Sequence, residues 1–170
     1  AELSARGVRI EVRLSERAFK PNRFLEGRIQ GTNCYAAFLS KGAELESVGY
    51  IGEAFILECT AMGLGTCWVG ASYHRAAVAD ELGLEADERI VCVTPIGHAG
   101  EPYQARPRRA LEKLTGLAAS ELDALPDWQR YALECARRAP SAVNRQPWAF
   151  RVDGPNLDLE NKGANFGYGR

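Results

Sequence analysis

The chain has 170 residues, enough for one domain of ordinary size with a real hydrophobic core. Hydrophobic residues make up 46% and charged residues 25%, as is typical of soluble globular proteins. The formal net charge of −1 excludes a global field that would attract nucleic acid or an anionic membrane, so we expect neither as a partner.

Cysteine and histidine usage narrows the possible sites. The five cysteines contain no Cys-x-x-Cys pair, and three lie within apolar runs. We therefore expect reduced, mostly buried thiols and a cytoplasmic protein. With two histidines and no clustered carboxylates, we expect no metal site.

No apolar stretch is long enough to span a bilayer, and the N-terminus lacks a signal-peptide pattern. The chain begins at Ala1 rather than at a methionine and ends at Arg170 without an obvious stop. We interpret residues 1–170 as a single domain, and both ends are consistent with cuts from a longer protein.

Hydrophobic periodicity predicts the elements in chain order. The first half reads as a half-buried strand over 8–14, a loop over 21–27, a buried strand over 33–40, a turn over 41–47, a helix over 48–62, a short strand or extended loop over 66–70 and a helix over 75–82. The second half reads as a turn over 86–89, a buried strand over 90–96, a long loop over 98–107, a short helix over 108–114, a helix over 127–138 and a β-hairpin formed by 148–152 and 157–159.

The helix over 48–62 has the strongest pattern, and its wide apolar arc predicts burial on most sides. Gly63 stands where a left-handed C-cap would follow. Gly49 and Gly52 weaken its first turns by about 1 kcal/mol each relative to alanine. A close backbone approach by another element would explain why that cost is tolerated.

The helix over 127–138 has Asp127 as its expected N-cap. Its expected apolar face consists of Trp128, Tyr131, Ala132 and Cys135. The alternation of strands and helices along the chain indicates a mixed, layered α/β domain.

The segment Ala139–Trp148 is a dense loop between a helix and a strand. Two prolines restrict its backbone, and Ser141, Asn144 and Gln146 supply hydrogen-bonding groups at close spacing. A rigid polar loop between regular elements is a common place for a small-molecule site. A helix stop followed by an ordinary connection is an equally good interpretation of its composition.

Two other segments carry compatible chemistry. Gly63–Gly70 exposes backbone N–H groups at its glycines and offers the flat face of Trp68. Arg106–Arg109 contains three arginines whose forked donors suit phosphate oxygens, although a solvated charge run is the favoured interpretation without context. Core packing is the alternative for both Trp68 and Trp148, and we favour it for Trp148. Together the three segments could hold a flat heteroaromatic ring with a phosphorylated tail.

These segments resemble the FMN-dependent nitroreductase family. Ala139–Trp148 resembles its Ala-Pro-Ser-Ala-x-Asn-x-Gln-Pro-Trp signature. Gly49–Gly70 is similar to the central helix of the family and the flavin loop that follows it. Val93–His98 is similar to the next strand of the family. The resemblance covers about residues 33–152. In this chain the Pro-Ser-Ala loop follows the central helix. This order of motifs resembles that of a subgroup of the family in which the loop lies in the C-terminal half.

The chain departs from the family's common pattern at its N-terminal side. The phosphate motif Arg-x-Ser-x-Arg is absent there, and Arg13–Arg17 is only superficially close to it. The resemblance implies an α+β class and a nitroreductase-like layered fold, with a central, mostly antiparallel sheet flanked by helices. It also implies a homodimer, or a single chain that imitates the two-lobed arrangement of one.

The resemblance further implies which residues bind FMN. Contacts along the flavin are expected from Pro140, Ser141, Ala142 and Asn144, with Gln146 supporting their loop. Near the flavin N5 the expected residues are Gly70 and Ala71, with Trp68 as a wall of the pocket. At the phosphate the expected residues are Arg106 and Arg108, with Arg109 as an alternate.

The implied activity is an NAD(P)H-dependent flavin oxidoreductase that reduces a nitroaromatic, quinone or similar acceptor by hydride transfer through flavin N5. No catalytic side chain is expected, and Cys67 is expected to be a buried bystander. Two alternatives stay open: a degenerate flavin-binding member with a binding or regulatory role, and an unrelated structural α/β protein whose motifs are coincidental.

Overall fold

The computed structural model describes residues 7–19, 29–101 and 104–163, and the chain divides into two compact units. We call the first, described over 7–19 and 29–101, the sheet unit, and the second, described over 104–163, the hairpin unit. Each has its own hydrophobic core. The prediction of one domain over 1–170 stays a prediction. The loop predicted over 21–27 lies outside the described residues.

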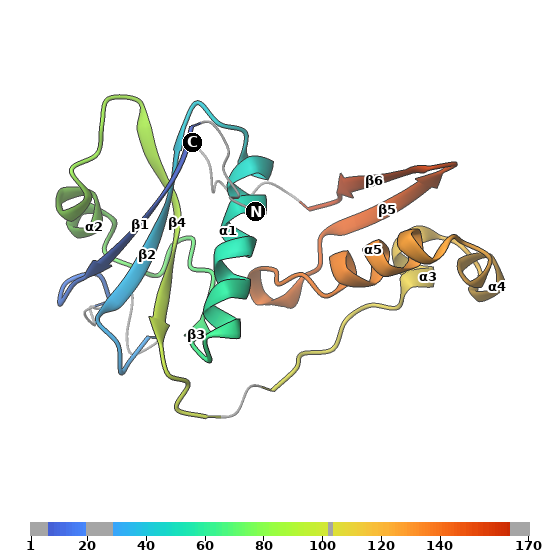
Figure 1. The fold of residues 1–170 in the computed structure, drawn as a ribbon, viewed down its shortest axis with the longest axis horizontal. Helices are drawn as coiled ribbons and strands as arrows, with labels where there is room; N and C mark the ends of the chain where they lie inside the picture. Colours follow the sequence, from blue (N-terminus) through green and yellow to red (C-terminus); the bar gives the residue numbers. More distant parts are fainter. Residues whose placement is uncertain (1–6, 20–28, 102–103, 164–170) are drawn as a thin grey trace. The chain divides into compact units, whose positions relative to one another are not determined.

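The sheet unit is built on a four-stranded sheet in the order β1-β2-β4-β3, and every neighbouring pair is antiparallel (Figure 1). Its strands are β1 (Val8–Leu14), β2 (Cys34–Lys41), β3 (Gly65–Thr66) and β4 (Glu88–Gly97). The predicted antiparallel sheet and α+β class are therefore confirmed. Val93 pairs with Ala37 in β2 and forms an isolated bridge with Val69, so the segment after β3 extends the sheet beyond that short strand.

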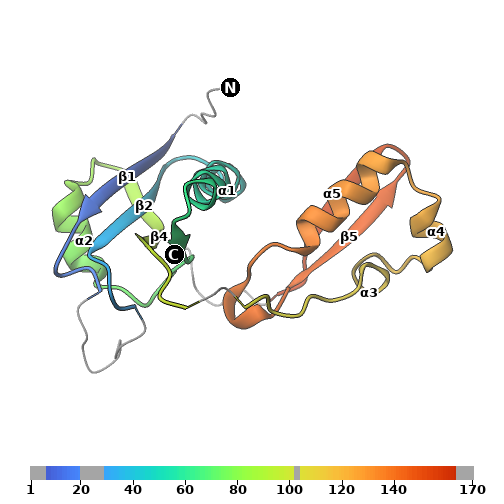
Figure 2. The same cartoon turned by 60° about the horizontal axis from the view of Figure 1, so that its bottom comes forward.

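Helices cover both faces of this sheet, as the two views in Figures 1 and 2 show. Side chains alternate along a strand, so Tyr35 and Leu39 of β2 pack with Val78 of α2 (Arg75–Leu82) on one face. Phe38 faces the other way and packs with Val48 of α1 (Leu45–Ala61). Burial on both faces explains why β2 reads as a continuous apolar run.

Helix α1 confirms its predicted C-terminal cap, because Gly63 has φ +75° just beyond the last turn. The prediction that α1 is buried on most sides is wrong. Val48 and Cys59 are buried, whereas Tyr50 and Leu57 are 66% and 60% exposed. A helix on one face of a sheet has only one stripe covered, and its opposite side stays exposed within the described residues.

The hairpin unit packs three helices against a two-stranded hairpin. Its elements are α3 (Leu111–Thr115), α4 (Ala119–Asp123), α5 (Asp127–Arg137), the short 3₁₀ helix Ala142–Asn144, β5 (Trp148–Asp153) and β6 (Asn156–Asn161). Its buried core consists of Leu114, Leu122, Leu133 and Phe150. The predicted hairpin is confirmed, and Gly154 supplies φ +55° in its turn.

Two details predicted for α5 are wrong. Its N-cap is Pro126, because Asp127 already has a helical position. The residues that face the core are Gln129 and Leu133, both 1% exposed. Gln129 turns inward because its Nε2 donates to the Gly154 carbonyl at 2.7 Å.

The predicted apolar face of α5 lies outward instead. Trp128 is 54% exposed, Tyr131 is 75% exposed, Cys135 is exposed and Ala132 is half-buried. Because Gln129 and Leu133 stand one helical turn apart, their shared inward direction leaves the stripe through Trp128 and Tyr131 in solvent within the described residues.

The five cysteines are free thiols, but the prediction that most of them are buried is wrong, because only Cys59 and Cys92 are buried and Cys34 is half-buried. Burial raises the pKa of the Cys92 thiol to about 12. The expectation of a buried Cys67 is wrong, because Cys67 is exposed, as is Cys135. Cys67 follows β3 in an extended segment where its neighbour Trp68 takes the inward direction.

Within the described residues, no helix combines the length and apolar character that crossing a membrane requires. The same residues contain no group of three or more histidine, cysteine, aspartate or glutamate side chains placed to hold a metal ion.

Candidate functional site

The loop between α5 and β5 has an unusual backbone. Val143, Asn144 and Gln146 have φ values of +47°, +58° and +51°, in the left-handed region that L-residues seldom adopt. Among the described residues only Asp87 is a further non-glycine case. Such a conformation costs about 1–3 kcal/mol at each residue and persists only where surrounding contacts impose it. Strain of this kind is concentrated at binding sites, so this loop is the first candidate.

Hydrogen bonds inside the loop hold it in this shape. Ser141 receives two of them: its Oγ accepts from the Gln146 N–H at 2.9 Å, and its carbonyl accepts from the Asn144 N–H at 2.9 Å. The Arg145 N–H donates to the Ala142 carbonyl at 3.2 Å. These bonds fold the chain back on itself between Ser141 and Gln146.

The arginine segment lies directly beside this loop. Asn144 donates from Nδ2 to the Pro107 carbonyl at 2.9 Å and accepts at Oδ1 from Nη1 of Arg108 at 3.0 Å. Gln146, which is 5% exposed, accepts at Oε1 from the Arg109 N–H at 2.7 Å. Two sequence-predicted segments, 37 residues apart at this last bond, thus meet inside one unit.

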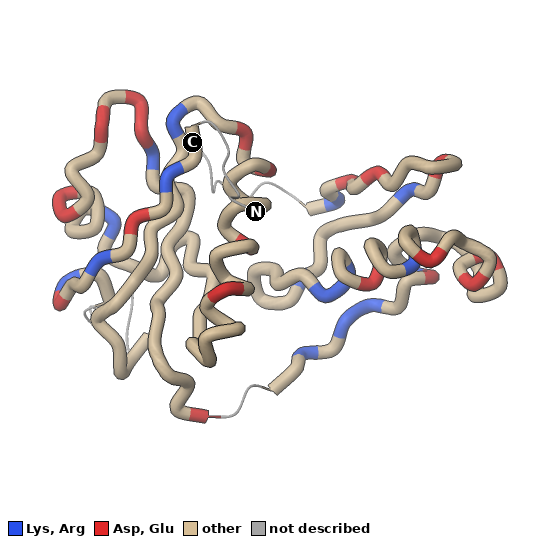
Figure 3. The backbone as a smooth tube through the Cα atoms, viewed as in Figure 1, with Lys and Arg blue, Asp and Glu red and all other residues tan. Residues whose placement is uncertain are grey.

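Three arginines follow one another closely on this segment. Arg106 and Arg109 are exposed, and within the described residues their guanidinium groups have no hydrogen bond or ion pair. Arg108 is half-buried and donates to the carbonyls of Arg138, at 3.2 and 3.1 Å, and of Arg106, at 3.1 Å. Figure 3 shows this basic stretch on the part of the chain that leads into α3. The segment therefore offers two uncommitted cations beside one that is tied to the protein.

An ion-pair network borders the site at the end of α5. Glu134 accepts from Arg137 through two bonds of 2.6 Å and from Arg138 at 2.9 Å. The hydrogen bonds from Arg137, and then those from Arg138, lower the pKa of Glu134 to about 2. Arg137 also donates to the Arg109 carbonyl at 3.4 Å. The sequence analysis missed this network, although the spacing of i to i+3 and i+4 could have revealed it.

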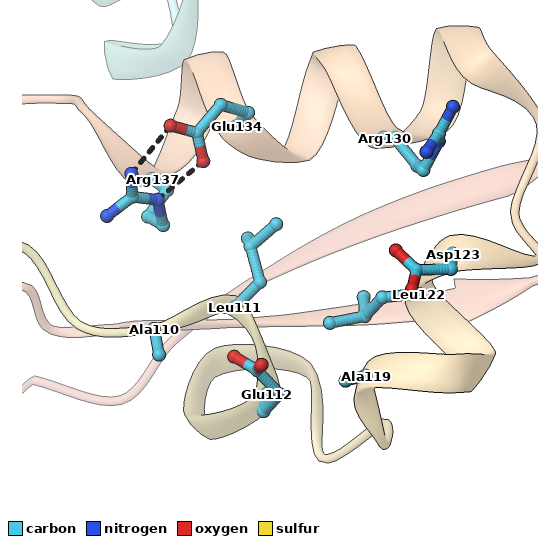
Figure 4. A pocket seen from close by; sticks show the side chains of 9 residues that line it. All are labelled: Ala110, Leu111, Glu112, Ala119, Leu122, Asp123, Arg130, Glu134 and Arg137. Carbon is cyan, nitrogen blue, oxygen red and sulfur yellow. Dashed lines mark hydrogen bonds and ion pairs between the residues drawn. The ribbon is translucent and has the colours of Figure 1, made fainter.

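A shallow pocket of about 310 Å³ lies between α3, α4 and α5 (Figure 4). It is lined by Ala110, Leu111, Glu112, Ala119, Leu122, Asp123, Arg130, Glu134 and Arg137. Its two arginines are both paired with acids, Arg130 with Asp127 and Arg137 with Glu134. With its cations already neutralised, the pocket is a weaker anion site than the loop beside Arg106 and Arg109.

The other predicted site residues belong to the sheet unit. Trp68 stacks on Phe38 with ring centroids 4.8 Å apart, and its Nε1 donates to Glu53 at 3.2 Å. The core alternative for Trp68 thus describes its packing in this unit. Gly70 and Ala71 are exposed. Joint contact of these residues and the hairpin-unit loop with one cofactor stays a prediction, as do all the assigned cofactor-binding roles.

Trp148 packs against the core of the hairpin unit, which confirms the favoured core interpretation. Its Nε1 is buried and has no hydrogen-bond partner within the described residues. Leaving such a donor unpaired costs about 1–3 kcal/mol.

The stretch that superficially matches the N-terminal phosphate motif is engaged elsewhere. Ser15 donates to Glu81 at 2.8 Å and accepts from the backbone N–H groups of Arg17 and Ala18. Arg17 pairs with Asp80 at 2.7 Å and with Glu81 at 3.1 Å. These residues fasten the end of β1 to α2, and a phosphate would have to compete with that role.

Comparisons with known proteins place this geometry in context. The model of one protein family, described as "Putative TM nitroreductase", matches residues 4–162. The solved structure of a putative nitroreductase from Thermotoga maritima is similar in fold, with a TM-score of 0.60 and 23% sequence identity. The match covers 91% of this chain and 58% of that one, so this chain spans little more than half of its relative. No curated protein matches.

Proposed function

Because the chain belongs to this nitroreductase family, we propose that it is an FMN-dependent oxidoreductase that takes electrons from NAD(P)H. The acceptor is a nitroaromatic, a quinone or a similar compound. The observation that carries the proposal is the joining of the strained loop at Ser141–Gln146 to the segment Arg106–Arg109.

The residues present fit the phosphate end of FMN. Arg106 and Arg109 provide guanidinium groups without a protein partner among the described residues, and such groups bind phosphate oxygens through charge-assisted bonds. A phosphate at that position would be close to the side chains that order the loop. Ser141 and Ala142 would then offer backbone groups to the ring.

Bound FMN would supply two-electron chemistry, accepting hydride from NAD(P)H and passing it to the acceptor. The chain's own residues would bind this cofactor and orient it. Arg106 and Arg109 would hold the anionic tail, and the ordered loop would keep its backbone donors in fixed positions. We include in the proposal a homodimer, or a two-lobed single chain, as the form that completes the site.

One observation favours a second candidate, a flavin-binding member without turnover. Arg17, in the stretch that superficially resembles the N-terminal phosphate motif, is paired with Asp80 and Glu81 instead. A chain that lacks this motif would hold the phosphate through fewer cations, and the flavin could then bind without being placed for hydride transfer.

The test is a titration of the purified protein with FMN and, separately, with riboflavin, followed by flavin absorbance and fluorescence. We expect FMN to bind more tightly than riboflavin and NADPH to bleach the flavin band. A nitroaromatic or a benzoquinone should restore the band. If FMN binds but the acceptor is not reduced, with or without bleaching by NADPH, the second candidate is supported. If FMN does not bind, both candidate functions are refuted.

A charge-matched pair of variants sharpens the test. Replacing both Arg106 and Arg109 by Gln should weaken FMN binding by about a hundredfold or more and leave riboflavin binding nearly unchanged, because each of the two charge-assisted bonds contributes about 1.5–3 kcal/mol. The control replaces both Arg130 and Arg151 by Gln and so removes the same two charges, since these arginines pair with Asp127 and Asp158 outside the loop. An equal effect of the control would show that net charge alone matters.

A further inference from the structure

The side chains of Asn144 and Gln146 form what we call the amide bracket, two amides that grip the backbone of residues 107–109. Asn144 contacts the Pro107 carbonyl and the Arg108 guanidinium, at 2.9 and 3.0 Å. Gln146 contacts the Arg109 N–H at 2.7 Å and the Pro107 carbonyl at 3.5 Å. We infer that Asn144 and Gln146 are positioning residues, which place the arginine segment for an anionic ligand rather than contact that ligand themselves.

Chemistry fixes which way each amide points. The Arg108 guanidinium and the Arg109 N–H can only donate, so each must face an amide oxygen. The Pro107 carbonyl can only accept, so it must face amide nitrogens. Each amide therefore uses its oxygen and its nitrogen on protein partners. An acid in place of either amide would set an oxygen against the Pro107 carbonyl.

The bracket also explains the backbone strain. Asn144 and Gln146 both have positive φ, and their side chains are the ones that reach across to the arginine segment. Gln146 Nε2 further donates to the Asn144 carbonyl at 3.3 Å, which ties the two strained residues together. Asparagine tolerates this conformation better than most residues, whereas glutamine has no such preference. The contacts of Gln146 therefore maintain an unfavourable backbone.

Removing the bracket would free the Pro107 carbonyl and the Arg109 N–H, and would leave the arginine segment held, within the described residues, only by the bonds of Arg108 to Arg138 and of Arg137 to the Arg109 carbonyl. Pro107 lacks an N–H, so its carbonyl is the only backbone hydrogen-bonding group it can contribute, and that carbonyl accepts from both amides. Arg109 is bound through its N–H, which leaves its guanidinium group available. The bracket thus holds the backbone and leaves the charges of Arg106 and Arg109 uncommitted.

The first experiment needs no ligand. Hydrogen exchange of the flavin-free protein should show a protected Arg109 N–H, and Gln146→Met should speed its exchange at least tenfold. Methionine has a similar length and the same backbone strain but no amide. The backbone N–H groups within β5 serve as the internal control. Unchanged exchange at Arg109 would overturn the bracket, whatever the protein binds.

The second experiment rests on the proposed function, because it uses FMN and riboflavin as probes. If the bracket places the arginines, Gln146→Met and Asn144→Gly should each reduce the preference for FMN over riboflavin at least fivefold. Asn144→Gly removes the side chain while relieving the positive φ, so misfolding from strain is avoided. Arg151→Gln should leave the preference unchanged.

The two probes separate positioning from contact. An Asn144 that touched the ring itself would weaken FMN and riboflavin equally in the glycine variant, and this result would overturn the positioning role. If the unaltered protein binds neither probe, the proposed function fails, and the exchange of the Arg109 N–H alone then decides the bracket.

Discussion

The two units hold their candidate site segments by different forces. In the sheet unit, Trp68 is held mainly by packing, because its ring stacks on Phe38 and only one hydrogen bond, from Nε1 to Glu53, accompanies that contact among the described residues. In the hairpin unit, the loop at Ser141–Gln146 is held by side-chain hydrogen bonds around a strained backbone. Packing tolerates little change in volume, whereas a hydrogen-bonded loop depends on each donor and acceptor. Four predictions test this difference.

The largest effect is expected from Phe38→Ala. Phe38 is fully buried and contacts Phe55 edge-on at 5.9 Å as well as Trp68 at 4.8 Å. Truncation of such a ring should lower the free energy of unfolding by about 3–5 kcal/mol, measured by urea titration. Leu159→Ala, at a residue 68% exposed in the hairpin unit, should change it by no more than about 0.5 kcal/mol. If Phe38→Ala lowers the free energy of unfolding by less than about 1 kcal/mol, packing is not the main force that holds Trp68 in the sheet unit.

A matched glycine pair on α1 should separate contact from helix propensity. A Cβ at Gly52 would stand 2.5 Å from Cη2 of Trp68, whereas a Cβ at Gly49 meets nothing within 4 Å among the described residues. Gly52→Ala should therefore destabilise the protein by about 1–3 kcal/mol, and Gly49→Ala should stabilise it by about 0.5–1 kcal/mol. Thermal unfolding of both variants is the measurement. Equal shifts in the unfolding temperature of the two variants would show that the Trp68 ring moves aside at no cost in stability.

Substitution of Val143 should relieve part of the backbone strain in the hairpin-unit loop. This β-branched residue has φ +47° and is 78% exposed, so it loses little packing when truncated. Val143→Gly should stabilise the protein by about 1 kcal/mol, since relief of strain exceeds the added chain entropy. Val143→Ala retains a Cβ and should have a smaller effect. Destabilisation by glycine would mean that the loop is not strained at this residue.

The smallest expected effect is a pH dependence at Glu134. Its pKa in the folded protein, about 2, lies below the ordinary value of 4.5. The ion pairs therefore stabilise the fold above about pH 4.5, and this contribution is lost as the pH falls towards 2. Because the side chain is 31% exposed, we expect about 1 kcal/mol or less. Urea unfolding at pH 6 and pH 3 should show a smaller decrease for Glu134→Gln than for the unaltered protein. An equal decrease would exclude Glu134 as the source.

Much of the fold could be predicted because hydrophobic periodicity distinguishes strands from helices, even where it misjudged which side of a helix is buried. The strand over 8–14, the helix over 75–82 and the hairpin formed by 148–152 and 157–159 were all predicted at or close to their observed positions. Helix α4 was missed, since five residues are too few to show a period. A close approach at Gly52 is present, but it comes from the side chains of Trp68 and Phe38 rather than from a backbone.

The candidate site was predictable in part. The polar loop and the arginine segment were identified from their residue types, and the structure brings them together. The role of Gln129 was not foreseen, because its partner, the Gly154 carbonyl, is supplied by a tertiary contact. Glu134 was missed although its partners lie only three and four residues further along the chain. Cys67 was expected inside and lies outside, since Trp68 takes the inward position.

The amino-acid sequence alone determined the family and most of the order of strands and helices, since these depend on local pattern and residue type. Tertiary structure decided which side of α5 faces the core and which groups Asn144 and Gln146 hold. The physical reason is that a polar side chain can be buried only beside a partner of opposite hydrogen-bonding character. That partner lies far along the chain, where no local pattern can show it.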